Sequence, residues 1–301
     1  MDTLIFQIYY QQEQTSCLDN EFIPYNNECD SDPLLEFNVF RKIIRSGVVD
    51  GCLLWGAVSW KFHQKTGVYG KELKKFITDN SGYDVYYCNP HVHLEAIFPN
   101  LWLQGETAHP EFLNLSREIF RVADIPEKWL TAVYPARAFA SANYLIATPA
   151  FWFAYIDYVE SILEKVRVGL SGEWLALLFS NAADYRNLHA GASYLPFIVE
   201  RLFMAFMLGS GRCFRSLKYP LPKQEAKLDH HQQLLRQMKD VACKGKSLWM
   251  LACWVNYRNL YLATRYPLSW IERYLPMLTP DPVEFIEFFD DFNVADSSRK
   301  S

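Results

Sequence analysis

The chain has 301 residues, half of them hydrophobic, which is enough to bury a sizeable core in one large domain or two small ones. Its 30 basic and 34 acidic side chains give a net charge of −4, which excludes a basic face large enough to follow a nucleic-acid backbone. Seven cysteines without a C-x-x-C pair predict free thiols and a reducing cytoplasm.

The N-terminal segment Met1 to Tyr10 has no basic region and no cleavage site, so it does not resemble a secretion signal. The longest apolar runs are interrupted by charges, namely Asp157 in one run and Glu200 with Arg201 in another. Neither run supplies about 20 uninterrupted apolar residues, and we therefore expect a cytoplasmic protein without a membrane span.

Strands are predicted mainly in the first part of the chain, at 4–10, 48–60 and 83–88, where apolar and β-branched residues cluster. Helices are predicted between these strands and throughout the later part, at 34–46, 71–80, 110–122, 149–166, 173–179, 196–208, 229–244, 247–264, 268–274 and 282–289. This order predicts one α/β domain over 1–301, with a mainly sheet-forming half (1–135) and a mainly helical half (136–301).

Asp84 lies between aromatic residues in the strand predicted at 83–88, which ends at Asn89-Pro90. A carboxylate in such a strand is costly unless it is paired or has a function. Because ligands gather near the carboxyl ends of strands in open α/β sheets, Asp84 is a candidate for binding a ribose or a metal. The alternative is that Asp84 caps a neighbouring loop.

A compact polar segment, Gln104-Gly105-Glu106, precedes His109-Pro110 and a predicted helix. The glycine permits close approach of the backbone, and an acid near a helix start is favoured by the helix dipole. This segment therefore predicts either a ligand contact or a helix cap.

Glu200 and Arg201 are adjacent on a predicted helix that is apolar nearly all round. Adjacent helix residues point in different directions, so each charge needs its own partner in the interior. Arg201 is thus either a clamp for a diphosphate or carboxylate, or half of a structural ion pair. Lys61 and Lys65, beside Trp60 and Phe62, are further candidates for phosphate or sugar contacts, or else part of an exposed loop.

His91 and His93 are two residues apart, but no third ligand has a diagnostic spacing, so surface histidines are the preferred interpretation. Fragments of a phosphate loop at Gly70-Lys71 and Gly245-Lys246-Ser247 lack the upstream glycine that this motif requires.

Taken in order, several segments resemble the glycosyltransferase-like proteins of bacterial O-antigen and capsule gene clusters. The matching residues are Ile8-Tyr9-Tyr10, Leu18-Asp19, Phe22-Ile23-Pro24 and Asn26; Trp55-Gly56, Ser59-Trp60-Lys61-Phe62 and Lys65-Thr66-Gly67; Asp84-Val85 and Asn89-Pro90; Asn100, Trp102, Gln104-Gly105-Glu106 and His109-Pro110; Asn143-Tyr144 and Ala147-Thr148-Pro149-Ala150-Phe151-Trp152; and Pro196-Phe197-Ile198-Val199-Glu200-Arg201-Leu202-Phe203.

The resemblance implies a GT-A-like nucleotide-sugar-binding sheet with a helical C-terminal region. It also implies transfer of a sugar from a nucleotide-sugar donor to a growing surface glycan, and allows association with other proteins of polysaccharide assembly. Two alternatives stay open. One is a non-catalytic carbohydrate-binding or scaffolding protein of the same locus, and the other is a hydrolase with two carboxylates roughly 5–10 Å apart.

On this hypothesis, Arg201 and Lys61 contact the donor diphosphate, and Asp84 orients the ribose or a divalent cation, Mg²⁺ or Mn²⁺. Such enzymes often carry Asp-x-Asp, whereas the triplet here is Asp84-Val85-Tyr86, which leaves metal dependence open. An inverting transfer needs a carboxylate near the attacking hydroxyl, and Glu106 is the first candidate, with Asp84 and Glu200 as alternatives. The remaining predicted substrate-binding residues are Asn89, Gln104, His109, Asn143 and Tyr144.

Overall fold

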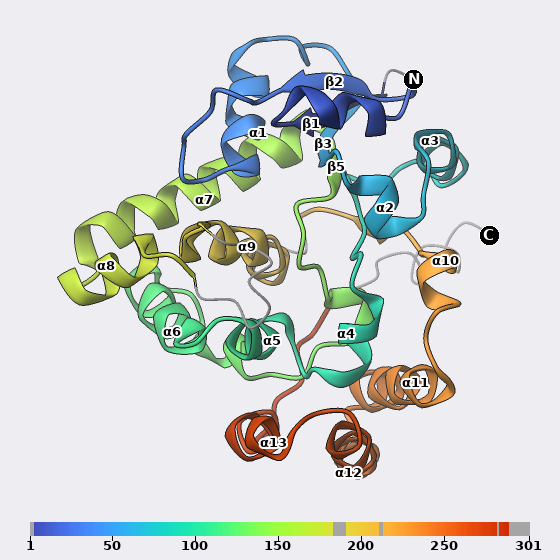
Figure 1. The fold of residues 1–301 in the computed structure, drawn as a ribbon, viewed down its shortest axis with the longest axis vertical. Coiled ribbons are helices and arrows are strands. Elements are labelled where there is room, and N and C mark those ends of the chain that lie inside the picture. The colour runs from blue at the N-terminus through green and yellow to red at the C-terminus, as the bar shows by residue number, and fades with distance from the viewer. Residues whose placement is uncertain (1–2, 183–190, 211–212, 282, 289–301) are drawn as a thin grey trace, which may run out of the picture.

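A computed structural model describes residues 3–182, 191–210, 213–281 and 283–288. In this part of the chain six strands form a single sheet in the order β2-β1-β3-β5-β4-β6 (Figure 1). Their bounds are Thr3–Tyr9 (β1), Ile23–Asn26 (β2), Leu54–Ser59 (β3), Val85–Tyr87 (β4), Leu145–Ala147 (β5) and Ser216–Lys218 (β6).

The sheet is mixed, because β5 runs antiparallel to both of its neighbours, β3 and β4. The pairs β1 with β2, β1 with β3, and β4 with β6 are parallel. The carboxyl ends of five strands and the amino end of β5 therefore lie at the same edge of the sheet.

The prediction that the strands near 4–10, 48–60 and 83–88 share one sheet is confirmed. The strand predicted at 48–60 corresponds to β3, which is shorter than predicted. The segment before Leu54 forms turns in which Gly47 and Gly51 adopt positive φ angles of 72° and 79°. Residues 283–288, which fall within the helix predicted at 282–289, do not form a helix, and Phe285 forms a parallel bridge with Val133. Residues 282 and 289 of that prediction lie outside the described residues.

Helices occur in both halves of the chain, and so do strands, since β5 and β6 follow residue 135. The helices before it are Glu36–Arg45 (α1), Phe62–Thr66 (α2), Gly70–Asp79 (α3), Val92–Ile97 (α4), Leu101–Ala108 (α5) and Phe112–Ala123 (α6). Those after it are Pro149–Gly169 (α7), Gly172–Phe179 (α8), Tyr194–Ser210 (α9), Pro222–Glu225 (α10), His230–Gly245 (α11), Leu248–Ala263 (α12) and Leu268–Tyr274 (α13). Short 3-10 helices cover Gln12–Cys17 (η1), Glu127–Leu130 (η2) and Ala136–Ala138 (η3).

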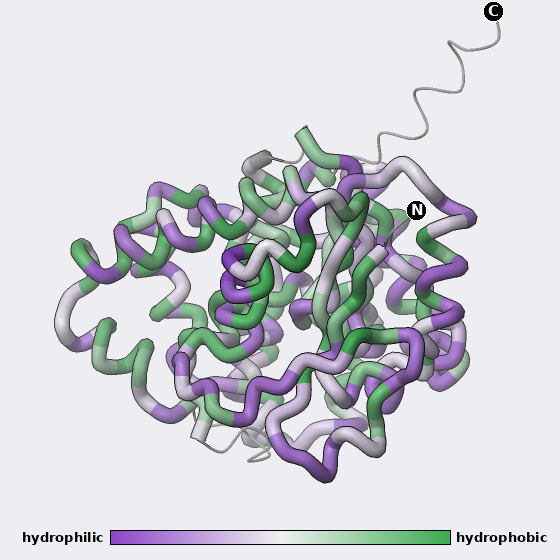
Figure 2. The backbone as a smooth tube through the Cα atoms, turned by 90° about the horizontal axis from the view of Figure 1, so that it is seen from above, coloured by the Kyte–Doolittle hydropathy of each residue, from purple (hydrophilic) through white to green (hydrophobic). Residues whose placement is uncertain are grey.

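The strands alternate between two cores, one on each face of the sheet. In β4, Val85 and Tyr87 join the larger core, whereas Tyr86 between them joins the smaller one. Figure 1 shows α7 and α9 on one side of the sheet and α2 and α3 on the other. In Figure 2 the hydrophobic strands run through the middle of the molecule. Burial of both faces explains why the inner strands β1, β3 and β4 are largely apolar, whereas the edge strands β2 and β6 are only partly buried or exposed.

No helix in the described residues is long and apolar enough to cross a bilayer. No disulfide joins any of the seven cysteines, all of which are in the described residues; Cys52 and Cys88 are buried and the others are partly or largely exposed.

Candidate functional site

A cavity of about 500 Å³ opens at the carboxyl edge of the sheet. Its walls include Tyr10 after β1, Ser59 at the end of β3, His91 after β4 and Asn143 before β5. In open α/β sheets this edge is the usual place for ligands, because the loops that follow the strands converge there.

Six of the residues predicted to bind or transform a substrate line this cavity. They come from four separate segments of the chain: Lys61, Gln104, His109, Asn143, Glu200 and Arg201. Four others lie elsewhere: Asp84, Asn89, Glu106 and Tyr144.

Arg201 is a buried cation on α9, with 4% of its surface exposed. Its guanidinium donates to the carbonyl oxygens of Leu101 (2.9 Å) and Phe197 (2.8 Å) and to Oε1 of Gln104 (2.7 Å). No carboxylate of the described residues lies within ion-pair distance of it, so the structural ion pair weighed from the sequence is absent. Each of its three nitrogens makes one of these bonds, which leaves one N–H on each terminal nitrogen for a ligand.

Burial lowers the pKa of Arg201 to about 10, and the neighbouring Glu200 partly offsets this effect. The side chain therefore still carries its charge at neutral pH. The guanidinium also lies over the Phe112 ring, with 4.7 Å from Cζ to the ring centroid. A buried charge whose hydrogen bonds all go to neutral oxygens is costly, and an anionic ligand in the cavity would stabilise it.

Glu200 is accompanied by a second carboxylate, Glu36, which lies in the first turn of α1 and lines the same cavity. Burial, and then repulsion from Glu36, raise the pKa of Glu200 to about 7, whereas Arg201 and Lys65 act in the opposite direction. Burial also raises the pKa of Glu36, and Lys65 opposes that shift. The cavity thus holds a carboxyl group that exchanges its proton near neutral pH.

No motif or pattern in the sequence pointed to Glu36. An acid in the first turn of a helix is typical of a solvated surface position. Only the packing of α1 beside α9 brings it into the cavity with Glu200.

Asn143 places a buried amide oxygen in the cavity wall. It is 4% exposed, and its Oδ1 has no hydrogen-bond partner in the described part of the chain. A buried acceptor in this state costs about 1–3 kcal/mol. A hydroxyl or N–H of a ligand would satisfy it, so this position is suited to recognising a polar molecule.

Asn89 and Tyr144 support the cavity wall from behind. The hydroxyl groups of Tyr144 and Ser59 share a hydrogen bond, with 2.8 Å between their oxygen atoms. Asn89 accepts a hydrogen bond from Oγ of Ser141 (3.0 Å) and donates to the buried carboxylate of Glu95 (2.8 Å). The two residues therefore position lining side chains, and the expectation that they contact the substrate directly is not supported.

Asp84 lies at the opposite edge of the sheet, which corrects its proposed place at the strand end. The strand begins at Val85, so Asp84 precedes β4. Its Oδ2 accepts from the backbone N–H of Arg215 (2.7 Å) and lies 3.8 Å from Nε of the same residue. The described residues contain no cluster of three or more His, Cys, Asp or Glu suited to a metal ion. Asp84 therefore does not fit the role of a cation ligand or a base in the cavity.

Glu106 is a helix cap, the alternative that the sequence left open. Its carboxylate accepts from the backbone N–H groups of Leu113 (2.7 Å) and Glu111 (3.3 Å), at the start of α6. Gln104, on the same helix α5, faces the cavity, whereas Glu106 is not among the lining residues. Burial raises the pKa of Glu106, and the two backbone hydrogen bonds oppose the shift.

Aromatic rings form much of the remaining wall. His109 stacks on Phe197 with 4.3 Å between ring centroids, and Tyr266 stacks on Trp270 at 4.1 Å. Lys61 is exposed at the rim, with its Nζ 4.8 Å from the centroid of the Trp60 ring. The Tyr266–Trp270 pair was missed from the sequence, because it lies far along the chain in a helical region with no motif.

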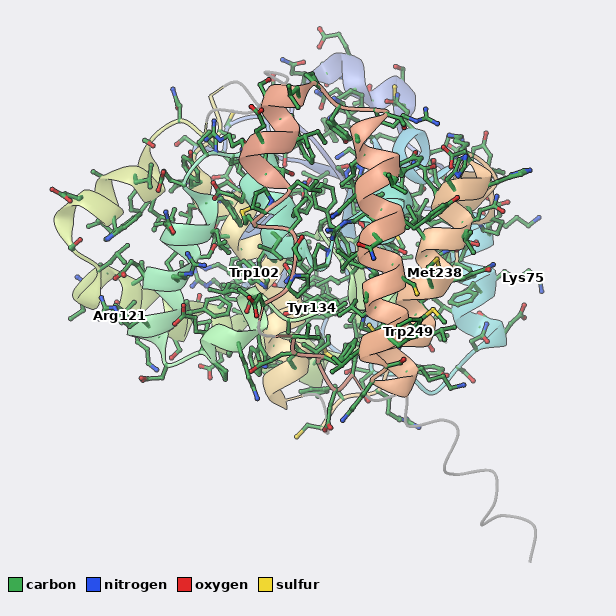
Figure 3. The ribbon with its side chains drawn as sticks, turned by 90° about the horizontal axis from the view of Figure 1, so that it is seen from below. Lys75, Trp102, Arg121, Tyr134, Met238 and Trp249 are labelled. Carbon is green, nitrogen blue, oxygen red and sulfur yellow. The ribbon has the colours of Figure 1, made fainter. Side chains whose placement is uncertain are left out.

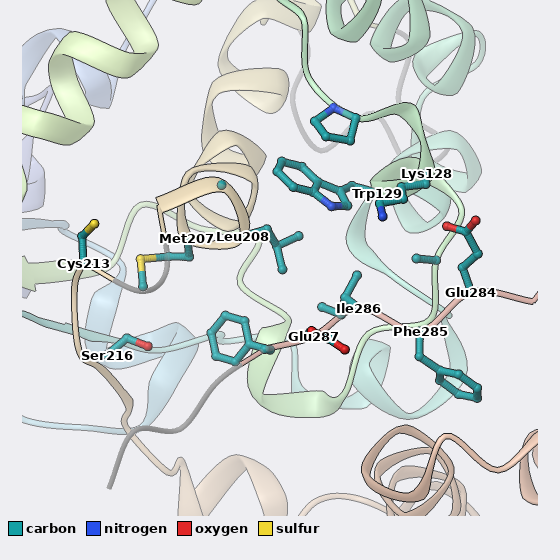
Figure 4. A pocket seen from close by; sticks show the side chains of 14 residues that line it. Lys128, Trp129, Met207, Leu208, Cys213, Ser216, Glu284, Phe285, Ile286 and Glu287 are labelled. Atoms are coloured by element: carbon teal, nitrogen blue, oxygen red, sulfur yellow. The ribbon is translucent and has the colours of Figure 1, made fainter. Parts of the chain in front are cut away.

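A second cavity, of about 550 Å³, lies between η2, the end of α9 and residues 284–288 (Figure 4). Apolar side chains such as Trp129, Leu208 and Ile286 point into it. None of the predicted site residues lines it, and Ser216 in its wall begins β6, at the amino edge of the sheet. The cavity at the carboxyl edge is therefore the candidate functional site.

Comparison of this chain with protein-family models, curated proteins and solved structures finds no match.

Proposed function

We propose that the protein is a glycosyltransferase that moves a sugar from a nucleotide-sugar donor to a growing bacterial surface glycan. The observation that carries this proposal is the convergence of Lys61, Gln104, His109, Asn143, Glu200 and Arg201 around one cavity. The mixed α/β sheet, with the cavity at its carboxyl edge, is compatible with the GT-A-like fold that the sequence resemblance implies.

The basic groups are suited to the donor diphosphate. Arg201 offers N–H groups from a fixed position, and Lys61 adds an exposed charge at the rim. Asn143 supplies an amide for hydroxyl groups, and the aromatic wall supplies surfaces for the base or a sugar ring. Each kind of side chain thus matches one part of a nucleotide sugar.

Glu200 is the proposed general base, in place of Glu106 and Asp84. A catalytic base works best when its pKa is near the working pH, and the pKa of Glu200 is about 7. For an inverting transfer, the acceptor oxygen forms a bond to the anomeric carbon while the bond from that carbon to the diphosphate breaks. The hydroxyl proton passes to Glu200, and Arg201 stabilises the departing diphosphate.

The first test is a thermal-shift screen of the purified chain against nucleotide sugars, because a ligand of the native state raises the melting temperature. Donors that bind are then incubated with glycan acceptors, and release of the nucleotide is measured. We expect a shift with at least one donor and a loss of this shift in Lys61→Met. The matched control Lys75→Met changes an exposed lysine on α3 and should keep the shift.

A second candidate function is supported by the two carboxylates, Glu36 and Glu200, on one cavity. Such a pair is also the catalytic equipment of glycoside hydrolases. Release of free sugar from an oligosaccharide without an acceptor would favour hydrolysis. Binding of a nucleotide sugar without turnover, across a broad panel of acceptors, would favour the non-catalytic alternative.

A further inference from the structure

The outer face of α12 is uncharged and mostly apolar, although it lies on the surface. The only charged residue of the helix, Arg258, is buried and donates to the carbonyl oxygen of Leu278 (2.8 Å). Figure 3 shows α12 across the face nearest the viewer, with Trp249 labelled. Trp249 is 79% exposed and Leu260 is 69% exposed. A helix that is hydrophobic nearly all round is normally covered on every side.

Five of the six exposed residues of α12 form a single stripe, which we call the α12 stripe: Trp249, Ala252, Asn256, Leu260 and Ala263. The sixth, Leu248, lies beside this stripe at the start of the helix. The first and last lie seven residues from Asn256, and the other two lie four residues from it. The stripe is therefore symmetric in position about Asn256. It is also complementary in size, because each large residue has a small one at the mirror position.

We propose that a second copy of this chain covers the α12 stripe, in a two-fold symmetric dimer with antiparallel α12 helices that cross at Asn256. Trp249 then faces the partner's Ala263, and Leu260 faces the partner's Ala252. The Asn256 amide meets the partner's Asn256, and an amide can both donate to and accept from its own copy. An isologous interface requires this self-complementarity.

Charge favours a second copy over an anionic membrane surface. The stripe contains no charge, so no like charges meet across the two-fold axis. Two of the basic residues beside the helix form ion pairs within the chain: Lys246 with Glu287 (2.6 Å) and Arg265 with Asp229 (3.2 Å). The basic rim that would hold a helix on anionic lipid is therefore weak here.

The contact is modest in size. The α12 stripe comes from a single helix, so we expect an interface at the lower end of specific interfaces, which bury roughly 1,000–1,200 Å². We therefore expect a dissociation constant on the order of micromolar. This inference does not depend on the proposed function.

The test is sedimentation of the full chain from about 1 to about 100 µM. The wild type should change from monomer to dimer across this range. Asn256→Asp and Asn256→Lys should each remain monomeric at neutral pH, because like charges meet on the axis. An equimolar mixture of the two variants should form a heterodimer. Lys75→Glu, a charge change on α3, should dimerise like the wild type.

A wild type that stays monomeric at about 100 µM would overturn the proposal. A wild-type dimer whose Asp and Lys variants do not combine would overturn the crossing at Asn256. Trp249→Ser should weaken the dimer by about tenfold or more, since a buried tryptophan usually carries much of an interface. Flotation of the monomer with phosphatidylglycerol vesicles, lost in Trp249→Ser, would assign the stripe to a lipid surface instead.

Discussion

Glu200 should destabilise the folded protein at neutral and alkaline pH, and replacing it with glutamine should relieve this cost. The pKa of Glu200 is raised from 4.5 to about 7, chiefly by burial and then by Glu36. Between these two pH values the folded state keeps a proton that the unfolded state releases, so stability falls as pH rises through the window. The full shift corresponds to about 3 kcal/mol, and solvent at the cavity reduces this to about 2 kcal/mol.

The assay is urea unfolding of the wild type and Glu200→Gln at pH 5 and pH 8. At pH 5 Glu200 is largely protonated and the two proteins should be about equally stable. At pH 8 the variant should be more stable by about 2 kcal/mol, since glutamine cannot ionise. Glu173→Gln removes an exposed glutamate of α8 and controls for the loss of one negative charge. A Glu200→Gln variant that is less stable at pH 8 would refute the reasoning.

Three further substitutions probe the same cavity and its surroundings. Glu36→Gln removes the second largest cause of the raised pKa of Glu200, so the pH at which the protein loses stability through Glu200 should be lower. An unchanged pH midpoint would contradict the electrostatic coupling between Glu36 and Glu200. Asn143→Ala removes a buried acceptor without a partner, so the free energy of unfolding from chemical denaturation should be unchanged or higher by about 1 kcal/mol. The affinity for the nucleotide sugar should fall, and an unchanged affinity would remove Asn143 from the site. Asp84→Asn keeps one acceptor for the Arg215 N–H, so it should lower the free energy of unfolding by about 1 kcal/mol and leave transfer activity intact. Loss of activity in the folded variant would return Asp84 to the catalytic site.

The long elements were predictable from the sequence, because burial leaves a periodic trace in it. The apolar runs at 4–10 and 83–88 correspond to β1 and β4, and the apolar segment 247–264 corresponds to α12. The strands β5 and β6 have three residues each, which is too short for a period to be recognised. Their place in the sheet is set by pairing with β3 and β4.

The physical argument for a site residue was strongest where its side chain conflicts with its sequence surroundings. Arg201 is such a residue, since a guanidinium in an apolar helix must be paired or face a ligand. Asp84 was assigned to the wrong edge because β4 begins at Val85, two residues after the start of the strand predicted at 83–88. Asp84 therefore precedes the strand and lies at its amino end. Glu36 could not be found, because its role depends on the position of α1 beside α9.

The central claim is that this cavity binds a nucleotide sugar through Arg201. The most direct measurement is calorimetric titration of a nucleotide sugar, identified by the thermal-shift screen, into the wild type and folded Arg201→Met, with Lys61→Met as a second variant at the exposed rim. Loss of a charged hydrogen bond of about 1.5–3 kcal/mol predicts an affinity roughly 10- to 150-fold weaker in Arg201→Met. Unchanged affinity in both folded variants would contradict the account.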